Sequence, residues 1–313
     1  METSPYGTIF HESDWLIMCS EHFNKDLKIY GCFEDGELVA GCSLFEYKFK
    51  NILKIASSTC PLTPYGGFVL KQFPISKVRK QFIEQQKWIE AVCSSLSKKG
   101  FDSIQITNSP DLLDIRPFKW NDWNYDVLYA YYLDLNKDIP ASFSRDVRSN
   151  IKKAINLNLE IKKMNNSNTF YELYTMTFAK HNLKPPVNKK FIADMMDLLE
   201  SKNCGEMRFV KTTSDELASA EITIWDNKRA YSWISASNSE LKNTGANSFL
   251  IYGICQDFKA RGFNEINIMS ANIPHLAKFN SSFNPKLVPY FWVYRNNLLY
   301  NFFKLSSEII RWF

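Results

Sequence analysis

The sequence predicts an α/β chain of the α+β kind, with two similar domains in tandem, each a mostly antiparallel mixed sheet flanked by helices. Its length of 313 residues suits two domains. An internal echo indicates a duplication, because residues 99–106 read KGFDSIQI and residues 261–268 read RGFNEINI, about half the chain apart. We therefore expect one domain over 1–138 and a second over 139–313, with these two segments in equivalent positions.

The first half reads as a helix, a three-strand meander over 29–56, a second helix, a strand, a short helix and an aromatic strand over 126–135. The second helix is predicted by apolar residues that share one face at 3.6-residue spacing, namely Val78, Phe82, Ile89, Val92 and Leu96. Gly100 then stands where a helix would end in a left-handed cap, and the alternation of Ile104 and Ile106 predicts a strand.

The second half repeats this order, with a meander over 207–236, a helix over 246–258, a strand after Gly262 and an aromatic strand over 287–295. Pro140 interrupts the pattern at the boundary, and Ser142 or Ser144 can cap the next helix. That helix, over 143–157, should bury one face made of Phe143, Val147, Ile151 and Ile155. A last amphipathic helix over 298–313 is expected to dock its stripe of Leu298, Phe302, Leu305, Ile309 and Trp312 on the sheet.

Composition favours a cytoplasmic protein with no metal. Apolar residues make up 45% and charged residues 23% of the chain, the first 15 residues lack the pattern of a signal peptide, and the longest uncharged stretch, 55–70, contains two prolines and two glycines. Seven scattered cysteines without a C-x-x-C pair suggest reduced thiols. Four histidines far apart in the sequence give a metal site little support.

The formal net charge of +5 is too small to argue for nucleic acid by itself. Positive charge concentrates in residues 145–163, which hold six basic residues against Asp146 and Glu160. Three of the basic residues fall on one helix face, opposite the apolar one: Arg145, Arg148 and Lys152. This face is either solvated or a clamp for substrate phosphates, and we name the three residues as candidate phosphate ligands.

The element order of each half resembles a GNAT-type (acyl-CoA N-acyltransferase fold) domain, and two such domains in tandem resemble the FemABX-like family of peptidoglycan-bridge aminoacyltransferases and their relatives. The segments that carry the resemblance are an R-x-x-I-x-K-A run at the entry to the second domain, an aromatic strand ending in small residues, the long helix after it, and a lysine–phenylalanine pair before the last strands: 148–154, 230–237, 247–262 and 275–283.

The resemblance implies an acyl- or aminoacyltransferase that acts on an amine of a sugar-nucleotide or cell-envelope precursor. The C-terminal domain would be catalytic, and the N-terminal domain structural or acceptor-binding. The donor would be an acyl-CoA or an aminoacyl-tRNA. The usual glycine-rich pyrophosphate loop is missing, since residues 235–248 contain only Gly245. The alternative, from another class, is a non-catalytic binding module for a phosphorylated glycan or RNA.

The expected partners are therefore a nucleotide-linked or phosphorylated sugar or peptide precursor, with tRNA as a further candidate. Peripheral contact with a membrane is the less favoured reading, because the C-terminal helix contains only Lys304 and Arg311 as basic residues.

Acyl transfer to an amine needs a proton acceptor, a donor to the oxyanion and, for some leaving groups, a proton source. Glu221, on the middle strand of the second meander, is the candidate base or a ligand of the acceptor amine, with a solvent-facing glutamate as the alternative. Lys278, near the family's lysine–phenylalanine position, could stabilise a phosphate or the oxyanion, or lie on a helix surface. Tyr290, on the last strand, is a third catalytic candidate, with a packed aromatic residue as the alternative.

The remaining candidates would bind substrate. Trp233, Ser235 and Ser237 lie toward the end of the aromatic strand, and Gly245 and Asn247 lie at the start of the following helix. The free N–H groups of that helix start could hold an anion of the donor, with the strand end as the opposite wall. The alternative is that small residues there only allow close packing. Asn272 could contact a sugar or peptide, or serve a turn.

Overall fold

The computed structural model describes residues 4–73, 77–180 and 182–306 of the chain, which forms two compact units. Unit 1 consists of residues 1–128 together with 289–313, and unit 2 consists of residues 129–288. In the described part of the chain, no helix has both the length and the apolar character needed to cross a membrane.

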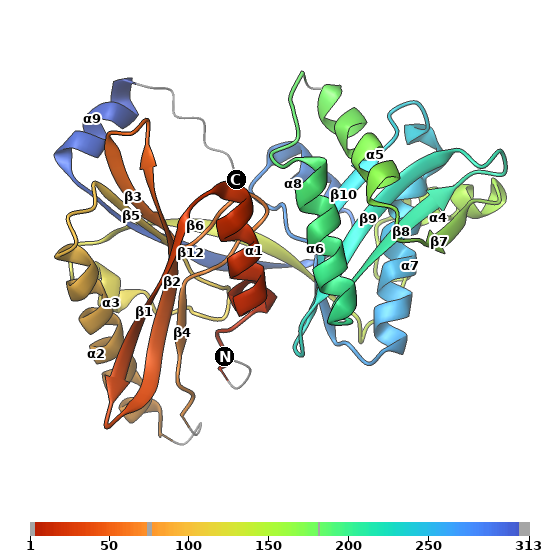
Figure 1. The fold of residues 1–313 in the computed structure, drawn as a ribbon. Coiled ribbons are helices and arrows are strands. Elements are labelled where there is room, and N and C mark those ends of the chain that lie inside the picture. The colour runs from red at the N-terminus through yellow and green to blue at the C-terminus, as the bar shows by residue number, and fades with distance from the viewer. Residues whose placement is uncertain (1–3, 74–76, 181, 307–313) are drawn as a thin grey trace. The chain divides into compact units, whose positions relative to one another are not determined.

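Unit 1 contains a mixed sheet whose strands run in the order β1-β2-β3-β5-β12, with β4 paired to β2 (Figure 1). Only β3 and β5 are parallel neighbours in this order. Its elements are a 3-10 turn at Ile9–His11, α1 (Ser13–Phe23), β1 (Asp26–Glu34), β2 (Glu37–Phe49), β3 (Leu53–Ser57), β4 (Phe68–Leu70), α2 (Val78–Ser97), β5 (Ser103–Thr107), α3 (Arg116–Lys119), the start of β6 (Asn124–Asp134), most of β12 (Lys286–Asn296) and α9 (Leu298–Ser306).

The core of unit 1 lies between helix α2 and the sheet. Trp88, Ile89 and Val92 of α2 are buried against the strands, and Val293 of β12 is fully buried in the same cluster. The helix predicted over 78–96 is therefore present with the expected apolar face, except that Val78, in its first turn, is exposed. An amphipathic helix buries its stripe only where the sheet extends beneath it.

Unit 2 contains a sheet in the order β6-β11-β10-β9-β8-β7, in which only β10 and β11 are parallel neighbours. Its further elements are α4 (Arg145–Asn156), β7 (Glu160–Lys163), α5 (Ser167–Ala179), α6 (Lys189–Ser201), β8 (Gly205–Lys211), β9 (Leu217–Trp225), β10 (Ala230–Ser237), a 3-10 turn at Lys242–Thr244, α7 (Ala246–Ala260), β11 (Glu265–Asn267) and α8 (Pro274–Ser281).

Helices cover both faces of the unit 2 sheet. Consecutive residues of β8 show this, because Phe209 packs against Phe170 of α5 while Val210 belongs to the core that α4 and α7 form. Helix α4 buries Val147 and Ile151 as predicted, but its third core residue is Ala154, and Ile155 is exposed. The prediction for Ile155 was wrong because the helix packs on α7 around a face centred on Ile151.

The echoed segments occupy equivalent places in the two units. Strand β5 is parallel to β3 and antiparallel to β12, and strand β11 is parallel to β10 and antiparallel to β6. Gly100 and Gly262 both have the left-handed backbone expected of a helix cap, with φ of 67° and 87°. The predicted fold class, with two domains of mixed α/β type, is therefore confirmed.

The compact units divide the chain differently from the expected boundary at 138/139. Strand β6 belongs to unit 1 up to Leu128 and to unit 2 from Tyr129, and strand β12 passes from unit 2 to unit 1 at Pro289. Strand β6, the aromatic strand of the first half, thus pairs with the echoed strand β11 of the second half. Strand β12, the aromatic strand of the second half, pairs with the echoed strand β5 of the first half.

The prediction that the C-terminal stripe docks on the sheet was wrong for Leu298 and Phe302, which are exposed, because α9 packs through Tyr300 against Leu53 and Ile55 instead. The other stripe residues, Ile309, Trp312 and the side chain of Leu305, lie outside the described residues, as do Arg311 and the side chain of Lys304.

Candidate functional site

The candidate site in unit 2 begins where strand β10 loses its parallel neighbour. The two strands pair only at Ala230–Ile266 and Tyr231–Asn267, yet β10 continues to Ser237. A register shift in β10 falls between Ser232 and Ile234, directly after this point. Strand β10 therefore extends six residues past its last pair with β11, and such a segment presents backbone N–H and C=O groups on that side.

The chain after β11 turns through two residues in the left-handed conformation. Met269 and Ser270 have φ of 49° and 51°, which is uncommon for residues other than glycine. Asn267 holds the turn by accepting a hydrogen bond from the Met269 N–H at 2.8 Å, and the buried Asn280 amide donates to the carbonyl of Ile268 at 3.1 Å. Sequence reasoning missed this turn, because neither residue type signals a positive φ.

Glu221 lies in the interior, on β9 directly opposite Ser235 of β10. Its side chain is only 2% exposed, so the alternative of a solvent-facing glutamate was wrong. The Ser235 hydroxyl donates to Oε2 at 3.1 Å, and the Thr223 hydroxyl lies 3.4 Å from Oε1. Burial raises the pKa of the Glu221 carboxyl from its ordinary value of 4.5 to about 7, although the hydrogen bonds from Ser232 and Ser235 oppose the increase.

Ser235 links this buried carboxyl to the surface, because Ser235 itself is exposed. A group with a pKa near 7 can accept or release a proton near neutral pH, which is the property that a general base requires. The Glu221–Ser235 pair can therefore carry a proton from the exposed edge of β10 into the sheet.

The buried Arg208 of β8 lies directly opposite Glu221 in the β8–β9 ladder. Sequence reasoning also missed this residue. Its guanidinium donates to Glu206 and to Asp257 of α7, and its positive charge acts against the rise in the pKa of Glu221. Burial would raise the pKa of Asp257, but the charges of Arg208, Arg261 and Lys163 lower it instead. Only an arginine between the apolar residues Met207 and Phe209 of a strand could have indicated this cluster.

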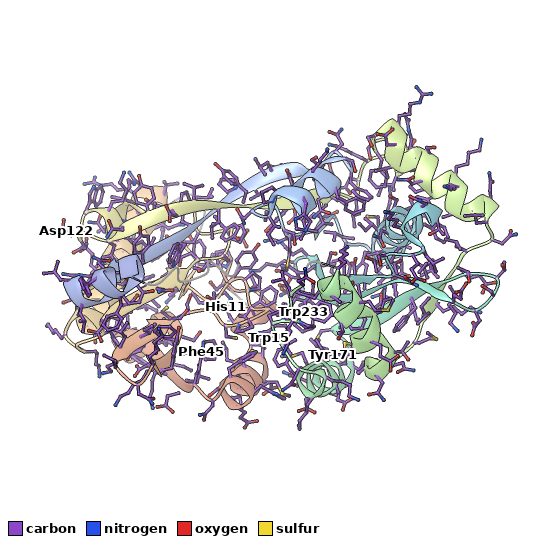
Figure 2. The ribbon with its side chains drawn as sticks, turned by 90° about the horizontal axis from the view of Figure 1, so that it is seen from above. His11, Trp15, Phe45, Asp122, Tyr171 and Trp233 are labelled. Carbon is purple, nitrogen blue, oxygen red and sulfur yellow. The ribbon has the colours of Figure 1, made fainter. Side chains whose placement is uncertain are left out.

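The three substrate-binding candidates on β10, Trp233, Ser235 and Ser237, contact different parts of unit 2. Trp233, labelled in Figure 2, is buried, with its ring 6.4 Å from that of Phe191 on α6. Ser237 exchanges hydrogen bonds with the Thr177 hydroxyl of α5, through its N–H at 2.9 Å and its carbonyl at 3.2 Å. Of the three, Ser235 is the one that contacts Glu221.

The start of helix α7 packs closely against α4. Gly245 has φ of 82°, and a Cβ atom built on it would lie 2.2 Å from the carbonyl oxygen of Asn150. The side of Gly245 on which a Cβ atom would lie therefore faces the backbone of α4. This is the contact that the close-packing alternative predicts. Asn247, in the first turn of α7, is exposed.

The other predicted residues lie apart from Glu221 or on the surface. Asn272 bonds both backbone groups of Tyr129, at 2.8 and 3.0 Å, and so fixes the connection to β6. Lys278 is exposed on α8, and Arg145, Arg148 and Lys152 are exposed on α4. Tyr290 belongs to unit 1, where its buried ring packs edge-on against Tyr65, with the ring centroids 5.1 Å apart.

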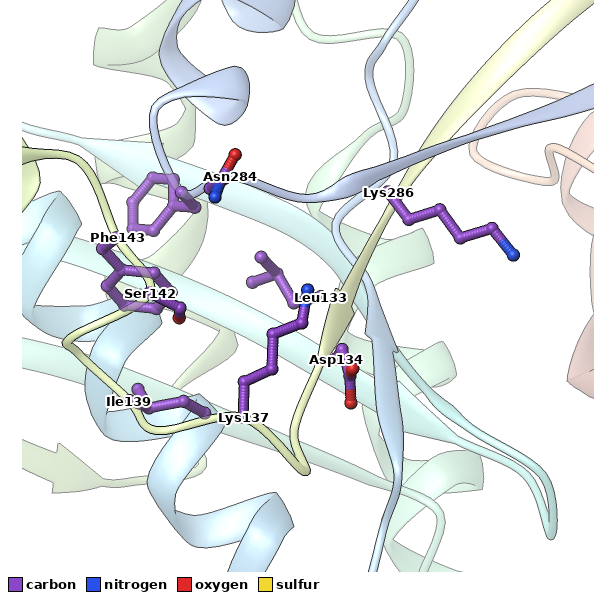
Figure 3. Close-up of a pocket in the computed structure, with 9 residues that line it drawn as sticks. Leu133, Asp134, Lys137, Ile139, Ser142, Phe143, Asn284 and Lys286 are labelled. Atoms are coloured by element: carbon purple, nitrogen blue, oxygen red, sulfur yellow. The ribbon is translucent and has the colours of Figure 1, made fainter.

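A cavity of about 230 Å³ lies at the start of α4 (Figure 3). Its apolar wall includes Leu133, Phe143 and Phe283, and its charged residues are Asp134, Lys137 and Lys286. A second cavity, of about 400 Å³, is lined by Glu200, Asn203, Gly205, Glu206, Trp225 and Arg261.

Residues 141–275, which lie within unit 2, match the acetyltransferase (GNAT) domain family. A search of the curated proteins finds no match. The family match and the fold together confirm the predicted resemblance to tandem GNAT-type acyltransferases, and they support acyltransferase activity.

Solved structures share the fold over nearly the whole chain at low identity. The crystal structure of FemX is 13% identical with a TM-score of 0.73, covering 97% of this chain and 96% of FemX. The C-terminal domain of a putative lysylphosphatidylglycerol synthetase from Agrobacterium fabrum is 12% identical, with a TM-score of 0.58 and coverage of 93% and 89%. A tandem GNAT protein from the clavulanic acid biosynthesis pathway is 10% identical, with a TM-score of 0.50 and coverage of 86% and 82%.

The position of Gly245 gives a first prediction. Alanine at Gly262, where φ is also positive but no atom lies within 4 Å of the added Cβ, should cost about 1 kcal/mol of unfolding free energy. Alanine at Gly245 should cost about 1–3 kcal/mol more, because the methyl group would overlap the carbonyl of Asn150. Urea denaturation of the two variants measures the difference, and equal losses would contradict the contact between α7 and α4.

The raised pKa of Glu221 gives a second prediction. The folded chain holds a proton on this carboxyl between pH 4.5 and about 7, where the unfolded chain does not. Its contribution to stability is therefore complete below pH 4.5 and is lost as the pH rises through about 7. Relative to the native protein, Glu221→Gln should gain roughly 3 kcal/mol of unfolding free energy over this pH range, since one pKa unit corresponds to about 1.4 kcal/mol.

The measurement is urea denaturation of both proteins at several pH values. Glu240→Gln, a change at an exposed glutamate of the same unit, is the matched control and should follow the native protein. A difference between native protein and Glu221→Gln that does not vary with pH would show that Glu221 ionises at its ordinary pKa.

Proposed function

We propose that this chain transfers an acyl or aminoacyl group from an activated donor to an amine of a sugar-nucleotide or cell-envelope precursor. The observation that carries the proposal is the buried Glu221 hydrogen-bonded to the exposed Ser235, at the strand segment where β10 has left β11. The match of residues 141–275 to GNAT acetyltransferases supports the class of reaction.

In the proposed reaction a neutral amine attacks the carbonyl carbon of the donor, forming a C–N bond. The amine proton passes to the Glu221 carboxylate, directly or through the Ser235 hydroxyl, so that the tetrahedral intermediate carries a neutral nitrogen. The bond between the carbonyl carbon and the leaving sulfur or oxygen then breaks, and the amide forms as the carbonyl is restored. The leaving group takes up the proton that Glu221 accepted and departs as a thiol or a hydroxyl.

Backbone N–H groups in the register shift of β10 would stabilise the oxyanion of the tetrahedral intermediate. A preorganised N–H donor at such a position contributes about 3–4 kcal/mol to the barrier in other acyl-transfer enzymes. The irregular backbone at Ser232–Ile234 supports this assignment, because a regular ladder would use the same groups for pairing.

The donor is proposed as an acyl-CoA or an aminoacyl-tRNA. The start of α7 does not fit the usual pyrophosphate loop, because Gly245 turns its open side to α4 and no glycine-rich turn precedes it. We therefore assign no contact to the phosphates of CoA. The exposed first turn at Asn247 is the remaining candidate for an anionic part of the donor.

The acceptor is proposed to carry phosphate groups, with Arg145, Arg148 and Lys152 as their ligands. All three are exposed, and none of them forms an ion pair with a described carboxylate. The cavity with Lys137 and Lys286 on its wall lies at the start of the same helix, α4. We propose that unit 1 serves a structural role or binds the acceptor.

The test is an acyl-transfer assay with acetyl-CoA and alanyl-tRNA as donors, and with an amino sugar nucleotide and a nucleotide-linked peptide carrying a free amine as acceptors. Mass spectrometry detects the amide. In an active pair, kcat/KM should rise with pH through about 7 as Glu221 loses its proton. Glu221→Gln should lower kcat by about 10²–10⁴, the usual contribution of a general base.

Glu172→Gln, at an exposed position of α5, is the matched control and should retain full activity. Lys278→Gln and Tyr290→Phe in the same assay test the other two predicted catalytic residues. Full activity of Glu221→Gln would contradict the proposed base. Binding of donor or acceptor in a thermal-shift assay without any amide product would favour a non-catalytic binding module.

A further inference from the structure

One end of unit 1 gathers three segments that are far apart in the sequence. They are the turn between β2 and β3 (residues 48–54), the loop after α2 (98–102) and the junction of β12 with α9 (295–302), which Figure 1 shows beside one another. The carboxylate of Asp102 joins them, because it accepts hydrogen bonds from the Lys54 N–H at 2.7 Å and from the Asn297 side chain at 2.7 Å. We call this end the lysine tip.

The lysine tip is strongly positive. It holds six basic residues, Lys48, Lys50, Lys54, Lys98, Lys99 and Arg295, and Asp102 as its one acidic residue. None of the six forms an ion pair with a carboxylate in the described part of the chain. Lys48 and Lys54 lie directly opposite each other in the β2–β3 ladder, and the Lys54 ammonium donates to the carbonyl of Lys99 at 3.1 Å.

The same end exposes large apolar side chains. Leu298 is 88% exposed, Phe302 69% and Ile52 59%. Leu298 and Phe302 are four residues apart and so share one face of α9. Helix α9 is held from its other side by Tyr300, which is buried against Leu53 and Ile55 and accepts a hydrogen bond from Gln105 at 2.9 Å. The exposed face is therefore fixed outward by the fold.

We propose that the lysine tip docks on a membrane surface containing anionic phospholipids. Lysine side chains complement anionic headgroups, and leucine, isoleucine and phenylalanine side chains enter the boundary between headgroups and acyl chains. A nucleic acid would account for the lysines but would leave Leu298 and Ile52 without an apolar partner. The inference goes beyond the proposed function, since it concerns where the chain works and uses no residue of the Glu221 site.

The test is co-sedimentation of the full chain with vesicles of mixed phosphatidylglycerol and phosphatidylcholine, compared with vesicles of pure phosphatidylcholine. The chain should bind the mixed vesicles, and added salt should weaken the binding. Removing lysines in Lys48→Gln/Lys50→Gln/Lys98→Gln should lower the partition coefficient by about fivefold for each lysine. Leu298→Ser/Phe302→Ser should lower it about tenfold or more, because both side chains lose their insertion.

The control variant Ile155→Ser/Lys189→Gln changes an exposed apolar residue and an exposed lysine of unit 2, and it should bind like the native chain. All variants should keep the native melting temperature, because every altered side chain is exposed. Acyl transfer between water-soluble substrates should be unchanged without vesicles, which separates this proposal from the assignment of Glu221.

Equal binding to both kinds of vesicle, or binding that survives both sets of substitutions, would overturn the proposal. A mobility-shift assay with tRNA covers the other partner class. Binding of tRNA that depends on the lysines but not on Leu298 and Phe302, together with no vesicle binding, would identify the lysine tip as a nucleic-acid surface instead.

Discussion

The early end of the parallel pairing between β10 and β11 is the constraint on which the site depends. Two residue pairs hold the strands together, and the buried Asn267 and Asn280 then turn the chain away through Met269 and Ser270. Because β10 continues without this neighbour, its register shift and the exposed Ser235 lie at an open strand edge. A fully paired sheet would have no edge at which a substrate carbonyl could meet backbone N–H groups.

A buried carboxyl beside this edge follows from the strand pairing on the other side. Ser235 lies opposite Glu221, and Glu221 lies opposite Arg208, so three adjacent strands bring a hydroxyl, a carboxyl and a guanidinium into one row. Arg208 is already engaged by Glu206 and Asp257, which limits its ability to keep Glu221 ionised. Burial therefore dominates, and the pKa of Glu221 increases to about 7.

Local patterns predicted the elements well, because helix periodicity and strand alternation are properties of short segments. The faces of α2 and α4 and the caps at Gly100 and Gly262 are examples. The exchange of β6 and β12 between the units could not be predicted, since a sequence does not say which sheet a strand completes. The burial of Glu221 was missed for a related reason: polar and apolar residues alternate along β9, which is typical of a strand with one face in solvent, whereas every interior residue of this strand is buried.

Contacts with segments distant in the sequence also occupy two of the predicted substrate-binding residues. Asn272 is occupied by the backbone of Tyr129, and the open side of Gly245 is filled by Asn150. The C-terminal helix contains few basic residues of its own, so the sequence argued against a membrane surface. The fold brings lysines from two other segments beside it through the hydrogen bonds of Asp102.

The ionisation of Glu221 can be measured directly by infrared difference spectroscopy of the native protein against Glu221→Gln as the pH is raised. The account predicts a protonated carboxyl band, absent from the variant, that disappears with a midpoint near pH 7 as the carboxylate forms. A midpoint near the ordinary value of 4.5 would mean that Glu221 is ionised throughout the neutral range, and would contradict its proposed role as a buried base that ionises near neutral pH.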